Sequence, residues 1–126
     1  MVVQNMYQHG WYTLCTSMSI RPGMPVRGSR TGRPVMILLD LLGRRWALRI
    51  LWELRGGASG FRELRAACDR LSPTILSRRL SEMSDLGIVA KDAAGRYRLS
   101  WRGAALLRRL RPLHAWAEEW ARSVRP

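Results

Sequence analysis

The stretch 69-DRLSPTILSRRLSEMSDLGIV-89 carries the start and stop signals of a short helix. Ser72 is a good N-cap residue, Pro73 favours the first helical position, and Gly87 suits the position just after the last turn. Apolar side chains recur at spacings of three and four and predict one buried face: Leu76, Leu80 and Met83, helped by Ile75 and Leu86. The opposite face then carries small hydroxyls and arginine, which raises the question of what it binds.

A second helix is predicted directly upstream, in 60-GFRELRAAC-68. Ser59 is placed to cap its start. Its apolar positions share one face: Phe61, Leu64 and Cys68. Cys68 is therefore interpreted as a small core residue and not as a reactive thiol. Since only residues 69–71 separate the two helices, the segment predicts a helix-turn-helix.

Downstream, the segment 88-IVAKDAAGRYRLS-100 alternates as short strands do. Ile88 and Ala90 are expected to share a face before a turn at residues 92–95. After the turn, two pairs are expected on opposite faces: Tyr97 with Leu99, and Arg96 with Arg98. A helix-turn-helix followed at once by a basic hairpin is a winged helix. The predicted fold class is therefore α+β, mostly α, with a two-stranded wing.

Two helices are predicted before the helix-turn-helix. The segment 34-PVMILLDLL-42 reads as a short buried helix with proline in its first turn and an end at Gly43. The segment 44-RRWALRILWELRGG-57 stops at its terminal glycine pair. Its apolar residues fall at helical spacing: Trp46, Ile50, Leu51 and Leu54. We expect one winged-helix domain over residues 34–126, because 126 residues leave little room for a second domain.

Residues 1–33 differ from the rest of the chain. They show no sustained period and hold no acidic residue, and they carry four arginines: Arg21, Arg27, Arg30 and Arg33. We expect a flexible basic arm here. One interpretation is an arm that touches DNA phosphates. The other, which we favour, is a disordered tail, or an over-long gene start whose true initiator lies at or near Met24.

The segment 101-WRGAALLRRLRPLHAWAEEWARSV-124 predicts a final helix. An apolar seam recurs at alternating spacings of four and three, and such a seam favours a partner helix. The residues expected in a homodimer interface are Leu106, Leu110, Leu113, Trp116, Ala117 and Trp120. The alternative is that the seam packs on its own domain, and part of it must do so. Pro112 is expected to kink or split the helix near Leu110.

The charge of the chain is strongly positive. There are 22 basic residues against 9 acidic ones, giving a formal net charge of +13, and Lys91 is the only lysine. GC-rich coding would explain the preference for arginine over lysine, but not the excess of basic residues. The imbalance favours an anionic partner, with nucleic acid first and a membrane surface second.

Several kinds of site are not expected. Cys15, Cys68, His9 and His114 lack the spacing of a zinc site. There is no nucleophile–base pair and no phosphate-binding glycine loop, so neither an enzyme nor a cofactor is predicted. No apolar run approaches the ~20 residues of a membrane span. We expect a cytoplasmic protein with free thiols.

The ordered set of features resembles the HxlR-type winged-helix transcriptional regulators of bacteria, over roughly residues 33–120. Three segments carry the resemblance: 38-LLDLLGRRWALRILWELRGG-57, 61-FRELRAACDRLSPTILSRRLSEMSDLGIV-89 and 97-YRLSWRGAALLRRL-110. Trp116 also falls where the family commonly has tryptophan. The resemblance implies a DNA-binding regulator with a recognition helix and a wing.

The chain departs from that family in three places. Arg33-Pro34 stands where many members have Cys-Pro, and in some members that cysteine senses oxidants or electrophiles, so this mechanism is not expected here. The hairpin is several residues shorter than usual and lacks the proline-containing tip, which argues against deep insertion of the wing. The proline often found early in the last helix is displaced to Pro112.

A recognition helix presents its N-terminal residues to base edges in the major groove of double-stranded DNA. The residues expected to contact DNA from this helix are Ser72, Pro73, Thr74, Ser77, Arg78 and Arg79. Arg78 is placed to reach a guanine or a phosphate, whereas Arg79 lies nearer the flank and is expected to touch the backbone. Further phosphate contacts are expected from Arg62, Arg65, Arg70, Lys91 and Arg96. A solvated polar face is the alternative.

We expect a sequence-specific transcriptional regulator, a homodimeric repressor whose recognition helices meet half-sites about 34 Å apart on a near-palindromic operator. The alternative is a nucleoid-like or RNA-binding protein that uses the same basic surface without sequence choice. A weaker hypothesis is an unknown small-molecule effector site where tryptophans converge, although such clusters more often form core. The tryptophans concerned are Trp46, Trp52, Trp101, Trp116 and Trp120.

Overall fold

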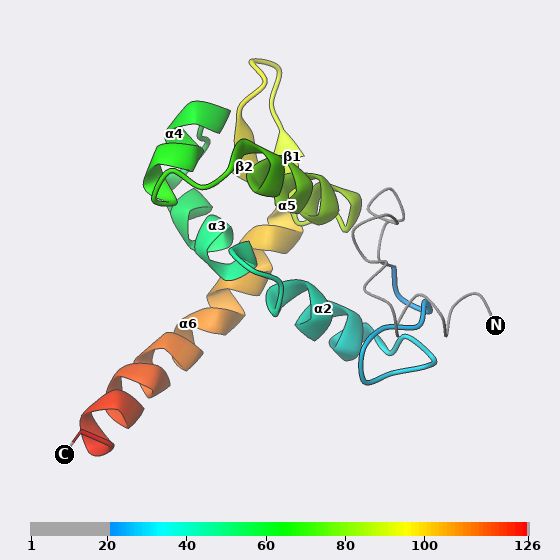
Figure 1. Cartoon of the computed structure of the whole chain (residues 1–126), viewed down its shortest axis with the longest axis vertical. Coiled ribbons are helices and arrows are strands. Elements are labelled where there is room, and N and C mark those ends of the chain that lie inside the picture. The colour runs from blue at the N-terminus through cyan, green and yellow to red at the C-terminus, as the bar shows by residue number, and fades with distance from the viewer. Residues whose placement is uncertain (1–20, 126) are drawn as a thin grey trace. The chain divides into compact units, whose positions relative to one another are not determined.

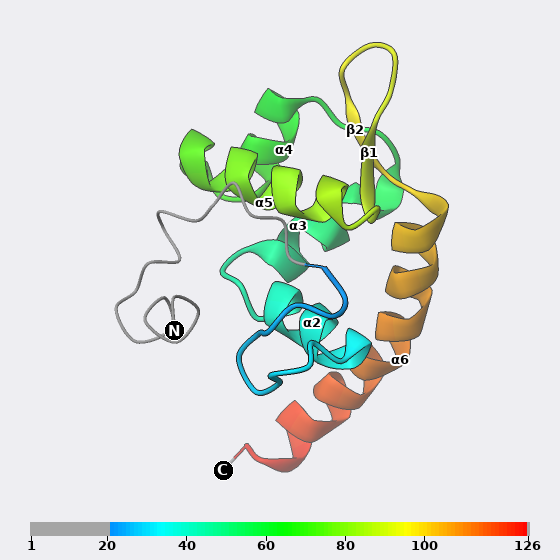
Figure 2. The ribbon, with the colours of Figure 1, turned by 90° about the vertical axis from the view of Figure 1, so that its right-hand side faces the viewer.

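The computed structural model describes residues 21–125. The chain divides into two compact units, Met1–Asp40 and Leu41–Pro126, and each is described by itself. The ribbon is shown in Figure 1 and, turned by 90°, in Figure 2. The predicted arm segment 1–20, with Cys15 and His9, lies outside the described residues.

In the first unit, the chain from residue 21 makes tight turns and then enters a helix. The backbone N–H of Gly23 donates to the Gly32 carbonyl at 2.9 Å. Gly32 has φ 63° and lies so close to the backbone of Met24 that a Cβ would collide with it. Helix α2 (Pro34–Leu42) then begins at the predicted proline.

The second unit holds the predicted helix-turn-helix and hairpin. Its elements, in chain order, are α3 (Ala47–Glu53), the 3-10 turn η2 (Leu54–Gly56), α4 (Phe61–Ala67), α5 (Pro73–Asp85), β1 (Val89–Lys91), β2 (Tyr97–Leu99) and α6 (Trp101–Ser123). Strands β1 and β2 pair antiparallel and form the wing. The predicted mostly helical winged-helix class is confirmed, with α5 starting and ending where its signals lie.

The core of this unit is built from the apolar stripes that the sequence predicted. Leu76, Leu80 and Met83 of α5 are buried against residues of α3, α4 and β1. Cys68 is fully buried among them, as expected of a small core residue. The predicted stop at Gly56-Gly57 is also confirmed, because α3 ends in the η2 turn there.

Two predictions about helix starts were wrong. Trp46 does not lie within a helix: it precedes α3 with a left-handed φ of 74°. Ser59 does not cap α4, which begins after Gly60; instead, Ser59 and Tyr97 exchange two backbone hydrogen bonds of 2.8 Å. The backbone N–H and C=O of Ser59 are satisfied by pairing with strand β2. Ser59 therefore lies beside the wing and not at the start of α4.

The residues of strand β1 that face the core also differ from the prediction. Val89, which pairs with Leu99, is buried, whereas Ala90 pairs with the exposed Arg98 on the other face. Ile88 is buried as expected but precedes the strand. The predicted alternation holds in β2, where Tyr97 and Leu99 pack against the core.

Helix α6 is continuous across Pro112, so of the kink or split predicted near Leu110 the split is wrong. Figure 2 shows that the helix is curved. Its start is fastened by Ser100, whose Oγ accepts from the Gly103 N–H at 3.1 Å and contacts the carbonyls of Gly87 and Ile88. Within residues 21–125, no helix combines the length and apolar character that crossing a membrane requires.

Candidate nucleic-acid interface

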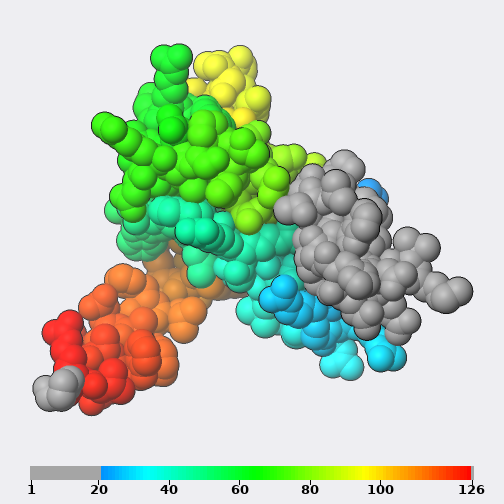
Figure 3. Space-filling model, viewed as in Figure 1, coloured from blue at the N-terminus to red at the C-terminus, as the bar shows by residue number. Residues whose placement is uncertain are grey.

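In the second unit, α4, α5 and the wing lie together at one end, and the C-terminal half of α6 extends toward the other end (Figures 1 and 2). The space-filling view shows the surfaces of α4, α5 and the wing adjoining one another (Figure 3). This arrangement brings to one end the three elements that carry most of the residues predicted to contact DNA (Figures 1 and 2).

The N-terminal face of α5 is exposed and carries small polar side chains. The exposed residues are Ser72, Pro73, Thr74, Ser77 and Ser81. Ser72 occupies the N-cap position, but its side chain makes no capping hydrogen bond. The Ser72 hydroxyl is therefore available to hydrogen-bond a ligand. The small side chains beside it leave room for a ligand to approach the helix closely.

The two consecutive arginines of α5 have different surroundings. Arg78 is a partly buried residue and forms no ion pair with any residue in the part of the chain that the structure describes. Arg79 is only 13% exposed: its Nε donates to the Arg45 carbonyl at 2.8 Å and its Nη1 to both carboxylate oxygens of Glu82 at 3.2 Å. Arg79, for which the sequence predicted a contact with the DNA backbone from the flank of the helix, thus has three acceptors within the protein.

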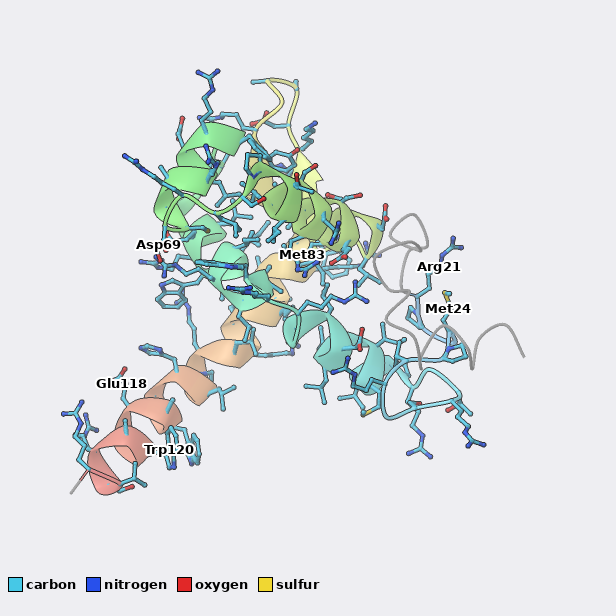
Figure 4. All side chains as sticks on the ribbon, in the orientation of Figure 1. Arg21, Met24, Asp69, Met83, Glu118 and Trp120 are labelled. Atoms are coloured by element: carbon cyan, nitrogen blue, oxygen red, sulfur yellow. The ribbon has the colours of Figure 1, made fainter. Side chains whose placement is uncertain are left out.

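The turn between α4 and α5 is held by side chains that sequence reasoning did not assign to this task. Asp69 and Arg70 are both left-handed, with φ of 56° and 57°. The Nε of Arg65 donates to the Leu71 carbonyl at 2.7 Å, and Nη2 of Arg49 donates to the Ala67 carbonyl at 2.9 Å. Asp69, labelled in Figure 4, also lies 3.8 Å from Nη1 of Arg49.

Arg65 is consequently committed to the turn, whereas Arg62 and Arg70 are exposed on α4 and in the turn. Both arginines precede α5 in the sequence. They remain candidates for phosphate contact.

The wing is stabilised by a carboxylate at its turn. Oδ1 of Asp92 accepts the backbone N–H groups of Ala94 and Arg96, each at 2.9 Å. These bonds, with that from Arg96 the largest cause, hold the pKa of Asp92 below its ordinary value. Arg96 is exposed with its Nε 3.6 Å from Asp92, and the ammonium of Lys91 lies 5.2 Å from the centre of the Tyr97 ring.

Comparison with known proteins identifies the kind of domain that carries this surface. Residues 41–125 match the profile of the HxlR-like helix-turn-helix family. The chain belongs to this family. The match spans the whole of the helix-turn-helix, the wing and α6, so it covers all the predicted DNA-contacting residues.

Individual relatives agree with this membership. An uncharacterized HTH-type transcriptional regulator of Bacillus subtilis, YvaP, is 35% identical over 88 residues, which cover 65% of this chain and 82% of that protein. The structure of quinone-bound YodB from B. subtilis has a TM-score of 0.64 at 29% identity, covering 68% of this chain and 96% of that one. A possible HxlR family transcriptional factor from Thermoplasma volcanium has a TM-score of 0.60 at 29% identity, covering 68% and 82%.

This HxlR-like protein is therefore a transcriptional regulator with a helix-turn-helix DNA-binding domain. Its family consists of transcriptional regulators and not of enzymes. Within the described residues, no group of three His, Cys, Asp or Glu side chains is placed to hold a metal ion. Burial raises the pKa of the Cys68 thiol, which disfavours the reactive thiolate.

The five tryptophans considered for an effector site do not converge, so that hypothesis is not supported by the structure. Trp46 packs on the core before α3, and Trp101 is exposed at the start of α6. Trp52 stacks on His114 at a centroid distance of 5.5 Å. Trp116 and Trp120 stack on each other at 5.9 Å, near the other end of α6.

The seam on α6 divides into two parts. Leu106 packs against the core, and Leu107, which sequence reasoning left out of the seam, is buried. Farther along, large apolar side chains are exposed, between 53% and 60% each: Leu113, Trp116, Trp120 and Val124. Figure 4 shows Trp120 standing out from this half of the helix.

Proposed function

We propose that this HxlR-like regulator is a sequence-specific, homodimeric repressor that reads a near-palindromic operator with α5. The observation that carries the proposal is the exposed N-terminal face of α5, where Arg78 has no ion pair among the described residues and small hydroxyls surround it. An arginine without an internal partner keeps its donors for guanine or phosphate.

The contacts divide by role. Base edges face Ser72, Pro73, Thr74, Ser77 and Arg78 from the recognition helix α5. Phosphates are gripped from beside it by Arg62 and Arg70, and from the wing by Lys91 and Arg96. These four side chains are all exposed. The salt dependence of binding then reports how many phosphates are neutralised, at about 0.9 in log–log slope for each.

The dimer is proposed from the apolar residues exposed on the C-terminal half of α6. A second copy of the same helix would cover Leu113, Trp116 and Trp120, and two-fold symmetry would present two α5 helices to successive half-sites, about 34 Å apart. We assign residues 34–126 to this domain and residues 1–33 to a basic arm.

The experiment is binding of the purified protein to the DNA upstream of its own gene, by fluorescence anisotropy at several salt concentrations. A scrambled duplex of equal composition is the control. We expect a preference for the native duplex that survives added salt and is lost in Arg78→Ala. Equal binding to both duplexes would refute sequence-specific reading and favour the non-specific nucleic-acid binder.

Repression is tested separately with a reporter fused to the same upstream DNA. A dimer seated on an operator excludes polymerase from an overlapping promoter. Reporter expression should therefore rise when the protein is removed and fall when it is supplied. A fall in expression on removal would instead identify an activator.

A further inference from the structure

A polar cluster beside the core joins the recognition helix to the segment that precedes α3. Nη1 of Arg44 lies 2.8 Å from Oε1 of Glu82, and the same carboxylate accepts from Arg79. Arg79 also reaches the backbone carbonyl of Arg45. We call these four residues, Arg44, Arg45, Arg79 and Glu82, the brace.

The three charged side chains of the brace that pair with one another lie largely out of solvent, whereas Arg45, which contributes its carbonyl, is exposed. The side chains of Arg79 and Glu82 are 13% and 11% exposed, and that of Arg44 is 27% exposed. The negative charge of Glu82 is therefore compensated by two guanidinium groups. Little water reaches this carboxylate, so water could not compensate the charge if an arginine were lost. Removing one member of a shielded, hydrogen-bonded ion pair leaves the remaining charge without compensation.

The brace supplies a kind of restraint that the apolar core does not. The stripe of Leu76, Leu80 and Met83 holds α5 against the core, but apolar contacts are not directional. The forked hydrogen bonds of Arg79 are directional and reach 34 residues back along the chain, to the Arg45 carbonyl. They therefore restrain the rotation of α5 about its own axis.

That rotation determines which side chains face outward. Successive residues project about 100° apart around a helix, so Arg78 and Arg79 point in clearly different directions. With Arg79 directed to the segment before α3, the hydroxyls of Ser77 and Ser81 lie on the exposed side, and Arg78, which is partly buried, has no ion pair among the described residues. A small roll of α5 would move them all together.

We propose that Arg79 and Glu82 are positioning residues that set the orientation of the recognition helix by bracing it against Arg44 and the Arg45 carbonyl, and that Arg79 is not a DNA contact. This inference rests on the proposed function, in which α5 reads DNA. It reassigns an arginine that the sequence placed on the phosphate backbone.

The decisive variant is Glu82→Gln. A purely electrostatic effect and the loss of the brace change the affinity for DNA in opposite directions. Losing a negative charge beside an anionic ligand should tighten binding if charge alone matters. If Glu82 braces the helix, losing the carboxylate that holds two arginines should weaken binding to the native duplex. We expect about a tenfold loss, the size that corresponds to one charge-assisted hydrogen bond. Arg79→Lys keeps the charge but loses the fork, so it should weaken binding similarly, whereas a phosphate contact would tolerate lysine.

Hydrogen–deuterium exchange of the free protein provides a readout that does not depend on DNA. We expect faster exchange of α5 amides in Glu82→Gln and Arg79→Lys. Arg78→Lys, the same chemical change one residue away, should leave exchange as in wild type. Melting curves establish that each variant is folded, and Glu82→Gln, which is nearly isosteric, is the variant least prone to unfold.

Binding as tight as wild type or tighter in Glu82→Gln, with unchanged exchange in α5, would overturn the inference. The double variant Arg79→Lys/Glu82→Gln should bind no more weakly than the weaker single variant, and additive losses would also count against a shared brace. If wild type shows no preference for the native duplex, the proposed function fails, and the exchange data alone then decide whether the brace orients α5.

Discussion

Arg78 and Arg79 are adjacent and chemically identical, yet their surroundings differ. Arg79 is satisfied by Glu82 and the Arg45 carbonyl, while Arg78 has no ion pair among the described residues. A guanidinium with three internal acceptors loses those bonds if it turns to DNA, and this cost favours its present position. The same reasoning separates Arg65, which holds the turn, from Arg62.

Gly103 is a position where the absence of a Cβ atom is required by close packing. A Cβ there would collide with the Ile88 carbonyl. Gly103→Ala should therefore lower the free energy of unfolding by about 1–3 kcal/mol, as overpacking usually does. Urea denaturation measures the change. Gly56→Ala, where a Cβ meets open space, is the matched control and should be nearly neutral; equal effects of the two variants would contradict this explanation.

Cys68 gives a prediction on pH. Burial raises the pKa of its thiol in the folded protein, so the unfolded chain ionises first as pH rises. The stabilisation is fully present below the ordinary thiol pKa of about 8.5 and is lost as pH rises through the raised value. Between pH 7 and 10, the free energy of unfolding should therefore fall more steeply in wild type than in Cys68→Ala. Parallel curves would show that the pKa of the thiol is not raised by folding.

Among the elements, the wing and α6 each depend on a short polar side chain at one end. Asp92 accepts hydrogen bonds from two backbone N–H groups at the wing turn. Ser100 accepts from the Gly103 N–H in the first turn of α6 and donates to the carbonyl of Gly87, just after α5. Ser59 adds a third extended segment beside Tyr97. Strand β2 is thus hydrogen-bonded on both sides, to β1 and to Ser59.

Asp92→Ala should loosen the wing without unfolding the domain. The N–H groups of Ala94 and Arg96 lose their acceptor, so their amides should exchange faster in nuclear magnetic resonance experiments. Asp92→Asn keeps an acceptor oxygen and is the control. In wild type, where the pKa of Asp92 is lowered, this restraint is present above the ordinary aspartate pKa of about 3.9 and is lost as pH falls through the folded value. Exchange that does not differ between Asp92→Ala and wild type would contradict this role.

For the whole molecule, the central question is what covers the apolar half of α6. Four large side chains are exposed there, and two of them are stacked tryptophans. Exposed clusters of this kind mark interaction sites in soluble proteins. The two-fold requirement of a palindromic operator gives the proposed dimer a functional reason.

Trp116→Ala and Trp120→Ala should each weaken the dimer by about 2 kcal/mol, or about thirtyfold in dimer Kd, if they are central interface anchors. Sedimentation velocity measures the shift toward monomer. Trp101→Ala is the control, because Trp101 is exposed on the same helix but lies outside the seam. A monomeric wild-type protein at high concentration would refute the dimer itself.

The sequence alone determined the elements of the helix-turn-helix and the wing. The apolar stripe of α5, its start at Pro73 and its end before Gly87 are local patterns, because helical and strand periods repeat within a few residues. Cys68 was placed in the core by the same reasoning. The family resemblance depended on this ordered set of local features, and it was confirmed.

Only the tertiary structure decided which partner each polar or apolar side chain meets. It paired Ser59 with Tyr97, buried Val89 in place of Ala90, and kept α6 continuous at Pro112. It also gave Arg79 a hydrogen bond to a carbonyl 34 residues away and left Arg78 without an ion pair among the described residues. Periodicity specifies which face of an element is apolar, but hydrogen bonds and ion pairs depend on distant segments, and those are brought together only when the core packs.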